Sequence, residues 1–505
     1  MKKTLLIRAD AGVAMGTGHV MRMIALAQAW LASGGEVIFL CSEITPSLEQ
    51  RIREEDLQLE KIIATPGSKA DCEATTAVVS GHAKGDRSLV VALDGYQFGS
   101  DFQLGIKKTH CPLLVVDDYG HAGGYHADFV LNQNVSAREE LYAKCDKTTQ
   151  LLLGPRFALL RREFADHRGW TRNIPEQATK LLVTLGGADA DNVTKKVIGA
   201  IRGAGLEVKV VVGGSNPHLS SLRQAAEAAT TGGTRVELVV NSSGMPGLMQ
   251  WADVAVAAGG STSWELAFTG LPSLFIILAE NQQENALELE RQGFGLCIGR
   301  YLDFDADAFR SAINRLARDA ALRTGFAARG RDMVDGLGAH RVAALLEAEI
   351  DLKLRCVIEA DFQLLWEWAN DTATRANSFD SAPIPWDHHK VWCHTKLRDP
   401  ECRLWIASTS EIGKIGVVRF DGHDSEATIS ITLAPQARGK GYAKRIIRSA
   451  CERMFALSRV ALIRALIKPE NKASVRAFES AGFLQNAGTT VKGQPAEQYL
   501  LHRTS

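Results

Sequence analysis

The sequence predicts an α/β protein with two doubly wound domains that face each other across a cleft, followed by a third domain of mixed α/β structure. Three observations carry this prediction: apolar runs alternate with helical segments, the alternation restarts after residue 171, and longer alternating strands begin near residue 351. Runs that are apolar throughout are typical of parallel strands buried on both faces of a sheet. The expected domains span residues 1–168, 169–348 and 352–505.

Five strands are expected in the first domain, at Thr4–Ile7, Glu36–Leu40, Leu89–Leu93, Leu113–Val116 and Phe129–Leu131. The helical spacing of Val20, Ile24, Ala27 and Trp30 predicts a helix between the first two strands. The polar stretch Thr171–Ala178, which contains a proline, ends this pattern. Five further strands are expected at Leu181–Leu185, Val208–Val212, Arg235–Val240, Val254–Ala257 and Ser273–Ile277. Ligands bind at the carboxyl ends of such strands, so two facing sheets favour a nucleotide-sugar enzyme.

Alternating strands distinguish the third domain, where they are expected at Arg403–Ala407, Lys414–Phe420, Ala427–Leu433 and Val460–Ile467. A long amphipathic helix is expected after Gly441. The helix Arg341–Glu349 is expected to form the bridge from the second domain.

Composition excludes several other classes of protein. The chain has 505 residues, and 58 basic residues balance 58 acidic ones, which argues against nucleic acid or an anionic membrane as a partner. The apolar start ends at Arg8 and Asp10, too short for a signal peptide, and no later run approaches the roughly 18–20 apolar residues of a membrane span. Nine scattered cysteines without a C-x-x-C pair indicate reduced thiols in the cytoplasm and no zinc site.

A glycine loop follows the first strand and opens its helix. Gly16 and Gly18 allow the backbone to approach a ligand, and His19 and Arg22 follow at the helix start. The ordinary pKa of histidine is about 6.5, so a histidine at this place is a plausible proton acceptor. A simple turn capped by His19 is the alternative.

Carboxylates and phenols end the next strands of this domain. Asp94 and Tyr96 follow one strand, and the sequence Asp117-Asp118-Tyr119-Gly120 follows the next. Two such motifs beside the glycine loop favour a shared cleft, although surface loops would explain either one alone. Arg156 and Arg161 come after the last strand, as pyrophosphate partners or as solvated charges.

The second domain repeats the arrangement with Gly187 and Asp189 after its first strand. Gly260, Ser261, Thr262 and Glu265 follow a later strand. Backbone N–H groups and hydroxyls suit a pyrophosphate, and a carboxylate suits ribose hydroxyls; an acidic residue in a first helical turn is also common without function. The next strand is followed by three amides expected to contact the sugar, namely Asn281, Gln282 and Asn285.

These segments together resemble a known family. Met15–Arg22 and Gly259–Glu265 resemble the two-domain, Rossmann-like GT-B fold of the lipid-linked N-acetylglucosamine transferases. The closer similarity, over about residues 1–345, is to the UDP-2,4-diacetamido-2,4,6-trideoxy-β-L-altropyranose hydrolases of pseudaminic acid synthesis. It is carried by Ile7–Asp10, Leu93–Tyr96, Val116–Asp118 and Leu159–Phe164.

This resemblance implies hydrolysis of the sugar–UDP bond at the anomeric carbon, with His19 activating water and Asp94 and Tyr96 beside the sugar. No metal signature accompanies these motifs. Helix N-termini and arginines can hold the diphosphate in place of a metal, so the reaction is expected to be metal-independent.

The third domain contains the most specific motif, Leu433–Ala443. Its glycines and basic residues resemble the Q/R-x-x-G-x-G/A loop of the GCN5-related N-acetyltransferases (GNAT), in which backbone N–H groups hold the pyrophosphate of acetyl-coenzyme A. Asn471–Phe483 resembles the second cofactor motif of that family. The resemblance, over about residues 352–505, implies that acetyl-coenzyme A contacts Leu433, Gln436, Arg438, Gly439, Lys440, Gly441, Tyr442, Asn471, Ser474 and Phe478.

One position departs from the family. Phe478 occupies a place where these enzymes often have a tyrosine that protonates the departing thiolate, so another donor, water or unassisted departure is expected. Upstream residues resemble the acetyltransferase of the same pathway, which implies that Arg375, His389 and Trp392 contact an amino sugar. Plain helix packing is the alternative for the tryptophan and the histidine.

The two resemblances imply consecutive steps on one chain. Acetylation of UDP-4-amino-4,6-dideoxy-N-acetyl-β-L-altrosamine would be followed by removal of UDP, and the free sugar would feed a sialic-acid-type synthase. Two alternatives stay open: a glycosyltransferase paired with a GNAT domain of other amine specificity, and a chain in which one part only binds the nucleotide sugar.

Overall fold

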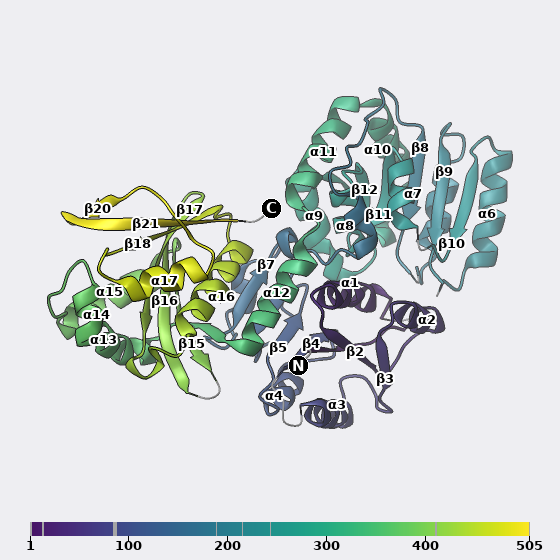
Figure 1. Ribbon diagram of the computed structural model, residues 1–505. Helices are drawn as coiled ribbons and strands as arrows, with labels where there is room; N and C mark the ends of the chain where they lie inside the picture. The colour runs from purple at the N-terminus through teal and green to yellow at the C-terminus, as the bar shows by residue number, and fades with distance from the viewer. Residues whose placement is uncertain are drawn as a thin grey trace. The chain divides into compact units, whose positions relative to one another are not determined.

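The computed structural model describes residues 3–12, 15–83, 88–187, 189–214, 216–242, 244–409 and 412–503. Two compact units divide the chain (Figure 1). The first unit comprises residues 1–144 and 151–343, and the second comprises residues 145–150 and 344–505.

The first sheet of the first unit has the strand order β3-β2-β1-β4-β5-β6-β7. Its strands are β1 (Thr4–Ala9), β2 (Glu36–Cys41), β3 (Gln58–Lys61), β4 (Leu89–Asp94), β5 (Leu113–Val116), β6 (Phe129–Asn132) and β7 (Gln150–Leu153). Its helices are α1 (Gly18–Ala32), α2 (Pro46–Glu54), α3 (Lys69–His82) and α4 (Ser100–Lys107), with 3-10 turns η1 (Glu139–Tyr142), η2 (Pro155–Phe157) and η3 (Arg162–His167). The pairs from β3 through β6 are parallel.

The second sheet of this unit is also parallel, in the order β10-β9-β8-β11-β12-β13. Its strands are β8 (Lys180–Thr184), β9 (Glu207–Val212), β10 (Val236–Val240), β11 (Val254–Ala258), β12 (Ser273–Ile277) and β13 (Gly295–Arg300). Its helices and 3-10 turns are α5 (Val193–Ala200), α6 (Leu219–Thr231), α7 (Met245–Trp251), α8 (Thr262–Phe268), η4 (Glu280–Gln282), α9 (Gln283–Arg291), η5 (Tyr301–Asp303), α10 (Ala306–Arg318), α11 (Ala320–Met333) and α12 (Gly338–Asp351).

The strand order places a topological switch point in each sheet. The chain builds outward from β1 to β3 on one side and then restarts beside β1 with β4. The second sheet does the same between β8 and β11. In doubly wound sheets the crevice at such a point binds ligands at the carboxyl ends of the strands. The loops after β1, β4, β8 and β11 are therefore the expected ligand-binding loops.

The second unit has a largely antiparallel sheet in the order β14-β15-β16-β17-β18-β21-β19, with β20 paired to β21. Its strands are β14 (Lys353–Cys356), β15 (Cys402–Thr409), β16 (Gly413–His423), β17 (Glu426–Leu433), β18 (Leu462–Ile467), β19 (Leu484–Gln485), β20 (Thr489–Val491) and β21 (Gln494–His502). Its helices and 3-10 turns are η6 (Glu359–Asp361), α13 (Phe362–Asn370), α14 (Thr372–Asn377), α15 (Trp386–Arg398), η7 (Pro435–Ala437), α16 (Tyr442–Leu457) and α17 (Lys472–Ser480).

The parallel pair β17–β18 opens toward the carboxyl end of β17. The two strands pair from Glu426 and Leu462 up to Ile429 and Ala465, whereas β17 continues to Leu433. The loop that precedes α16 starts at this open end.

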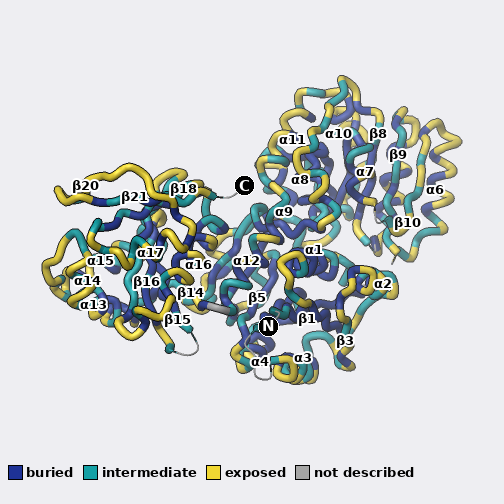
Figure 2. The backbone as a smooth tube through the Cα atoms, viewed as in Figure 1, coloured by how far each residue is buried: buried dark blue, intermediate teal, exposed yellow. Residues whose placement is uncertain are grey.

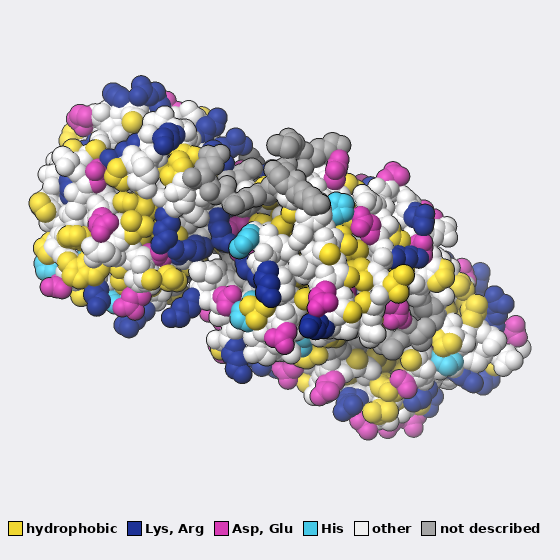
Figure 3. Space-filling view, turned by 90° about the horizontal axis from the view of Figure 1, so that it is seen from below, with side chains coloured by type: hydrophobic (Ala, Val, Ile, Leu, Met, Phe, Trp, Pro, Cys, Tyr) yellow, Lys and Arg dark blue, Asp and Glu magenta, His cyan; other side chains and the backbone are white. Residues whose placement is uncertain are grey.

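Burial follows the pattern that the sequence predicts. Every residue of β4, β11 and β12 is buried, as expected for parallel strands covered on both faces, and Figure 2 shows strands in dark blue within more exposed helices. Basic and acidic side chains are intermixed on the face shown in Figure 3, in keeping with the balanced charge. The predicted fold class, two doubly wound parallel sheets and a mixed third sheet, is confirmed.

Some element boundaries differ from those expected. The helix expected at Arg341–Glu349 runs from Gly338, because the Asp335 carboxylate accepts the Leu337 N–H just before it. The strand expected from Val460 begins at Leu462, because the N–H groups of Ala461 and Leu462 both bond to the Ser425 carbonyl. The short strand β3 was not predicted, since its residues are only half-buried or exposed and lack an apolar run.

Candidate active sites

A cleft of about 880 Å³ opens in the first unit at the carboxyl ends of both parallel sheets. Thirteen of the predicted UDP-sugar and catalytic residues line it: Gly16, Gly18, His19, Arg22, Tyr96, Arg161, Gly187, Gly260, Ser261, Thr262, Glu265, Asn281 and Gln282. They come from the loops at both switch points and from η4, except Arg161, which directly precedes η3. The sequence motifs of the two domains therefore meet in one cavity.

The glycine loop after β1 places His19 on the wall of the cleft. Gly16 has a φ of +77°, a conformation that favours glycine, and α1 starts at Gly18. His19 Nδ1 lies 2.7 Å from Asp94 Oδ1, at the end of β4. An ionised carboxylate only accepts hydrogen bonds, so Nδ1 carries a proton, and in the neutral imidazole the lone pair is then on Nε2. This His–Asp dyad can accept a proton at Nε2.

Arg22, one turn further along α1, keeps the dyad carboxylate ionised. Its Nε and Nη2 donate to both oxygens of Asp94 at 2.6 and 2.7 Å, and its Nη1 donates to Asp118 Oδ1 at 2.7 Å. Burial would raise the pKa of Asp94, but the charges of Arg22 and His19 hold it below its usual value. Burial also opposes ionisation of Asp118, yet Arg22 lowers that pKa to about 2.

Tyr96 closes the network toward the second sheet. Its hydroxyl donates to Asp118 Oδ2 at 2.6 Å and accepts from Asn281 Nδ2 at 2.6 Å, and its ring meets the His19 ring edge-on at 4.9 Å. Burial and the Asp118 carboxylate raise the pKa of Tyr96 well above its usual range. The hydroxyl therefore keeps its proton, and its hydrogen bond with Asn281 helps to join the two halves of the unit across the cleft.

The loops of the second sheet approach the first sheet closely. A Cβ on Gly187 would lie 2.5 Å from Thr17 Oγ1, so only glycine fits there without a shift. Gly260, Ser261 and Thr262 line the cleft with backbone N–H groups and hydroxyls. Ala14 and Ala188, which belong to the two glycine loops, lie outside the described residues.

Glu265 and Arg161 form an ion pair on the cleft wall. Arg161 Nη2 donates to Glu265 Oε1 at 2.9 Å, and Arg161 Nη1 lies 3.6 Å from Glu163. Burial opposes the charge of Arg161, but the two glutamates raise its pKa. Arg161 is thus held by carboxylates, and the predicted contact of Glu265 with ribose stays a prediction.

Four residues of the predicted set do not line this cleft: Asn285, Asp189, Arg156 and Asp94, of which Asp94 is fully buried and contacts His19 instead. Asn285 is buried; it donates to the Gly259 carbonyl at 3.0 Å and accepts from the Val135 N–H at 3.2 Å. Asp189 accepts from the first N–H groups of α5, at 2.8 Å from Val193 and 3.0 Å from Thr194. Arg156 accepts from the Arg341 guanidinium through its carbonyl at 2.9 Å. The first two side chains hold loops in place, which spacing after a strand does not reveal.

Several polar cleft residues lie outside the predicted set, and Asp118 and Asn134 are two of them. Asp118 belongs to a motif that the sequence singles out, but its role as partner of both Arg22 and Tyr96 appears only in the structure. Asn134 donates to Asp118 Oδ1 at 3.2 Å and to the Asp118 carbonyl at 3.1 Å. Its signal in the sequence was its place just after β6, at the same edge of the sheet as the other loops.

In the second unit, the predicted cofactor loop joins β17 to α16. Gly439 and Gly441 have φ values of +75° and +79°, and a Cβ on either would meet no atom within 4 Å. These glycines are required by backbone conformation, and the space in front of them is open.

The other predicted residues of this loop differ in exposure. Gln436 donates to the Lys414 carbonyl at 3.4 Å and Lys440 is exposed. Leu433 is half-buried, and Tyr442 is buried at the start of α16.

Arg438 points from this loop to the α13–α14 junction. Its guanidinium contacts Asp371 Oδ1 at 2.6 Å, Thr374 Oγ1 at 3.0 Å and the Leu433 carbonyl at 3.3 Å. Asp371 also caps α14. In this structure Arg438 ties the loop to α14, the helix that carries Arg375.

The second cofactor motif forms the start of α17. Asn471 Oδ1 accepts from the Ser474 N–H at 3.1 Å and caps the helix. Phe478 is buried and packs edge-on against Phe483 at 5.0 Å. The ring at this position is therefore a core residue that offers no proton to a thiolate.

The predicted amino-sugar residues are engaged within the protein. Arg375 donates to the carbonyls of Ala369 at 2.6 Å, Asp380 at 3.0 Å and Ala382 at 3.3 Å, so it fixes the loop after α14. His389 is buried between the rings of Trp386 and Trp392, and burial lowers its pKa. For His389 these contacts agree with the alternative that it packs between helix side chains and does not contact a sugar.

No group of three or more His, Cys, Asp or Glu side chains among the described residues is placed to hold a metal ion. None of the helices in that part of the chain combines the length and the apolar character needed to cross a membrane.

Comparison with known proteins assigns domains to both units. Residues 181–320 match the glycosyltransferase family 28 C-terminal domain, and residues 351–484 match the acetyltransferase (GNAT) domain. An uncharacterized protein of Methanocaldococcus jannaschii is 21% identical over 505 residues, 97% of each chain. The spore coat polysaccharide biosynthesis protein SpsG of Bacillus subtilis is 25% identical over 348 residues, 68% of this chain and 97% of that protein. The UDP-2,4-diacetamido-2,4,6-trideoxy-β-L-altropyranose hydrolase of Campylobacter jejuni is 22% identical over 296 residues, 57% of this chain and 97% of that protein.

Proposed function

Starting from a chain that joins a glycosyltransferase family 28-type region to a GNAT acetyltransferase domain, we propose that it catalyses two consecutive steps on a UDP-linked amino sugar. The GNAT domain acetylates the 4-amino group of UDP-4-amino-4,6-dideoxy-N-acetyl-β-L-altrosamine. The first unit then hydrolyses UDP-2,4-diacetamido-2,4,6-trideoxy-β-L-altrose to UDP and the free sugar. The name of the Campylobacter jejuni relative and the motifs of the cleft support this substrate.

The observation that carries the hydrolase proposal is the His19–Asp94 dyad on the wall of the cleft. A water molecule beside His19 Nε2 attacks the anomeric carbon. The new bond joins the water oxygen to that carbon, the bond from the carbon to the UDP oxygen breaks, and the water proton moves to Nε2. Asp94 stabilises the imidazolium that results, because its carboxylate is held ionised by Arg22.

The opposite wall receives the charge of the leaving group. Gly260, Ser261 and Thr262 offer backbone N–H groups and hydroxyls to the diphosphate. Arg161 donates to Oε1 of Glu265, and within the described ranges no hydrogen bond engages Oε2, which we propose binds the ribose hydroxyls. With these donors and Arg161 at the diphosphate, we propose that hydrolysis needs no metal ion.

Acetyl transfer takes place in the second unit, with acetyl-coenzyme A as the donor. The positive-φ glycines Gly439 and Gly441 leave the loop open to the pyrophosphate. The 4-amino nitrogen attacks the thioester carbonyl, the carbon–sulfur bond breaks, and the amine loses a proton to water as the amide forms. Phe478 offers no proton to the thiolate, so water is the proposed donor.

Mass spectrometry of the UDP-amino sugar incubated with the protein tests both steps. With acetyl-coenzyme A, the mass of one acetyl group should appear first on the UDP-sugar and then on the free sugar. Without acetyl-coenzyme A, the acetylated species should be absent. Unchanged UDP-amino sugar in both incubations would contradict the proposal.

Glycosyl transfer is the second candidate, favoured by the match of residues 181–320 to a glycosyltransferase domain. A transferase needs an acceptor in place of water. Release of free sugar from the acetylated UDP-sugar without any acceptor supports the hydrolase, and turnover only after an acceptor is added supports the transferase.

We propose the cytoplasm as the compartment, because all nine cysteines are free thiols and both proposed co-substrates are small metabolites. A sialic-acid-type synthase remains the proposed consumer of the free sugar.

A further inference from the structure

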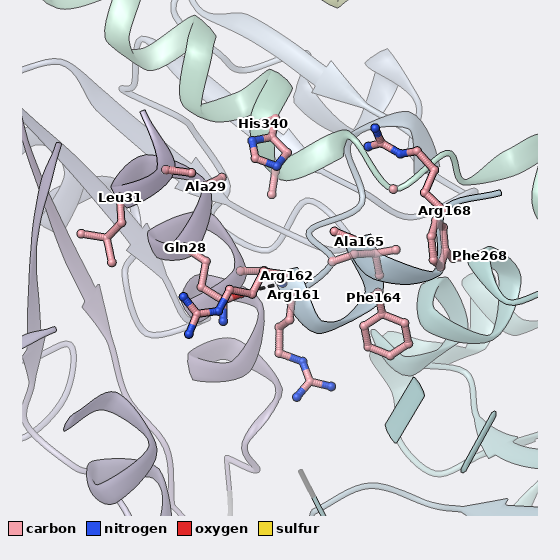
Figure 4. Close-up of a pocket in the computed structure, with 15 residues that line it drawn as sticks. Gln28, Ala29, Leu31, Arg161, Arg162, Phe164, Ala165, Arg168, Phe268 and His340 are labelled. Carbon is pink, nitrogen blue, oxygen red and sulfur yellow. Dashed lines mark hydrogen bonds between the residues drawn. The ribbon is translucent and has the colours of Figure 1, made fainter. Parts of the chain in front are cut away.

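A second hollow in the first unit, of about 280 Å³, lies beside the last turns of α1 (Figure 4). Its walls are the α1 residues 25–32, the segment 160–168 with η3, the side chain of Phe268 and the start of α12. It shares only Arg161 with the nucleotide cleft. Nothing in the proposed reactions uses this hollow.

The charge around the hollow is of one sign. Arg161, Arg162, Arg168 and His340 line it, and no aspartate or glutamate does. Two of these side chains are neutralised elsewhere, since Arg161 pairs with Glu265 at 2.9 Å and Arg162 with Glu55 at 3.0 Å.

Arg168 remains as the available cationic group, and the imidazole of His340 lies near it as a further hydrogen-bond donor. Within the described part of the chain, no hydrogen bond or ion pair engages either side chain. Figure 4 shows both at the same rim of the hollow, whereas Arg161 points away from them. Burial lowers the pKa of His340 and the nearby charge of Arg168 lowers it further, so at neutral pH the imidazole is a neutral hydrogen-bonding group.

The floor of the hollow is apolar. Ala25, Ala29, Leu160 and Phe268 line it and are buried. A small ligand with an apolar body and one acidic group matches both features, because the body would cover the floor and the acid would meet Arg168 and His340.

From this arrangement we propose that the hollow is a binding site for a small organic anion, separate from the nucleotide cleft, in which Arg168 and His340 hold the acidic group. The arginine supplies a fixed fork of donors suited to a phosphate or a carboxylate. The apolar floor distinguishes such a ligand from an inorganic ion.

Calorimetry on the full-length protein tests the site. With the cleft saturated by UDP, phenyl phosphate and benzoate are titrated separately, and benzyl alcohol serves as the uncharged control. At least one anion should bind one-to-one, and benzyl alcohol should not. The tighter anion identifies the ligand class as a phosphate monoester or a carboxylate.

Arg168→Gln should weaken that binding by roughly ten- to a hundredfold, the range for a lost hydrogen bond to a charged group. Arg318→Gln is the matched control, because Arg318 is an exposed arginine of the same unit at a shallow hollow that also holds Asp319. The His340 ring signals should shift on binding in the wild type. Equal affinity in Arg168→Gln and the wild type, or loss of binding when UDP is present, would overturn the proposal. Binding of UDP itself reports on the cleft, so the two proposals can fail independently.

Discussion

Single side chains determine the chemistry of the cleft, and His19 is the first to test. His19→Asn removes the lone pair that accepts the water proton, so hydrolysis of the acetylated UDP-sugar should fall by about 10²- to 10⁴-fold. UDP affinity should stay within a factor of about two, because the diphosphate donors lie on the opposite wall. Steady-state kinetics and calorimetry measure the two quantities.

A matched control for this substitution is His82→Asn. His82 is an exposed histidine that also pairs with a carboxylate, at 3.0 Å from Glu60. His82→Asn should hydrolyse the acetylated UDP-sugar at the wild-type rate. Near-normal hydrolysis by His19→Asn would remove His19 from the mechanism.

The ion pair of Asp118 with Arg22 in the cleft predicts that the stability of the fold depends on pH in the acid range. Its pKa of about 2 in the folded protein lies below the ordinary value of 3.8, so it contributes stability that is present above about pH 4 and lost as the pH falls toward 2. Asp118→Asn should lower the free energy of unfolding at pH 7 by about 2 kcal/mol. It should also flatten the fall in stability between about pH 4 and pH 2. Urea unfolding at several pH values gives both quantities.

An exposed aspartate of the same unit, Asp101, provides the comparison for this experiment. Asp101→Asn should change the stability at neutral pH little. If Asp118→Asn shows the acid dependence of the wild type, the pairing of Asp118 with Arg22 does not stabilise the fold.

The site was only partly predictable at this scale, and the reason is side-chain direction. His19 and Asp94 were named from their places at the ends of β1 and β4, and they form the dyad. Asn285 follows a strand in the same way, yet its amide points inward to Gly259 and Val135. A position in the sequence places a residue at the edge of a sheet but does not say toward which neighbour it turns.

Elements were more predictable than side chains, because periodicity and strand order depend on many residues at once. The continuous apolar runs predicted buried parallel strands, and the switch points then placed the loops after β1, β4, β8 and β11 in one cleft. The short strand β3 was not predicted, because it contains no run of buried apolar residues.

The loop before α16 gives the prediction at this scale. Gly441→Val forces a β-branched residue into φ +79° and fills the space in front of the loop, so acetylation should be lost. Hydrolysis of the acetylated UDP-sugar should be unchanged, because that reaction lies in the first unit. Acetyl-coenzyme A-dependent mass change and UDP release measure the two activities.

Gly413→Val is the control for this loop. Gly413 also has a φ of +79° with no atom near its missing Cβ, but it lies at the start of β16. The strain is therefore matched and only the position differs. Acetylation lost equally in both variants would show a folding defect, and acetylation retained in Gly441→Val would show that this loop is not the cofactor site.

For the whole molecule, the proposed domain boundaries predict independence of the two activities. A chain ending at Asp351, the last residue of α12, retains both parallel sheets and every cleft residue. It should fold and hydrolyse acetylated UDP-sugar within about twofold of the full-length rate. Circular dichroism and UDP release measure folding and activity.

The reference for this truncation is full-length Gly441→Val, which has every residue but should not acetylate. If the truncated chain is folded and inactive while Gly441→Val hydrolyses normally, the second unit is needed to complete the hydrolase. The sequence predicted the two kinds of sheet, but whether one unit supports the other depends on contacts that no sequence pattern encodes.

The hydrogen bond from Asn281 to Tyr96 has a consequence for selectivity. The phenol engages one of the two N–H groups of this amide, so the second N–H can meet a sugar while the bridge to Tyr96 stays intact. An acetamido oxygen would accept from that second N–H, whereas a free ammonium group has no lone pair to offer. The proposed hydrolase site would thus favour the acetylated sugar by one hydrogen bond, which would favour acetylation before hydrolysis.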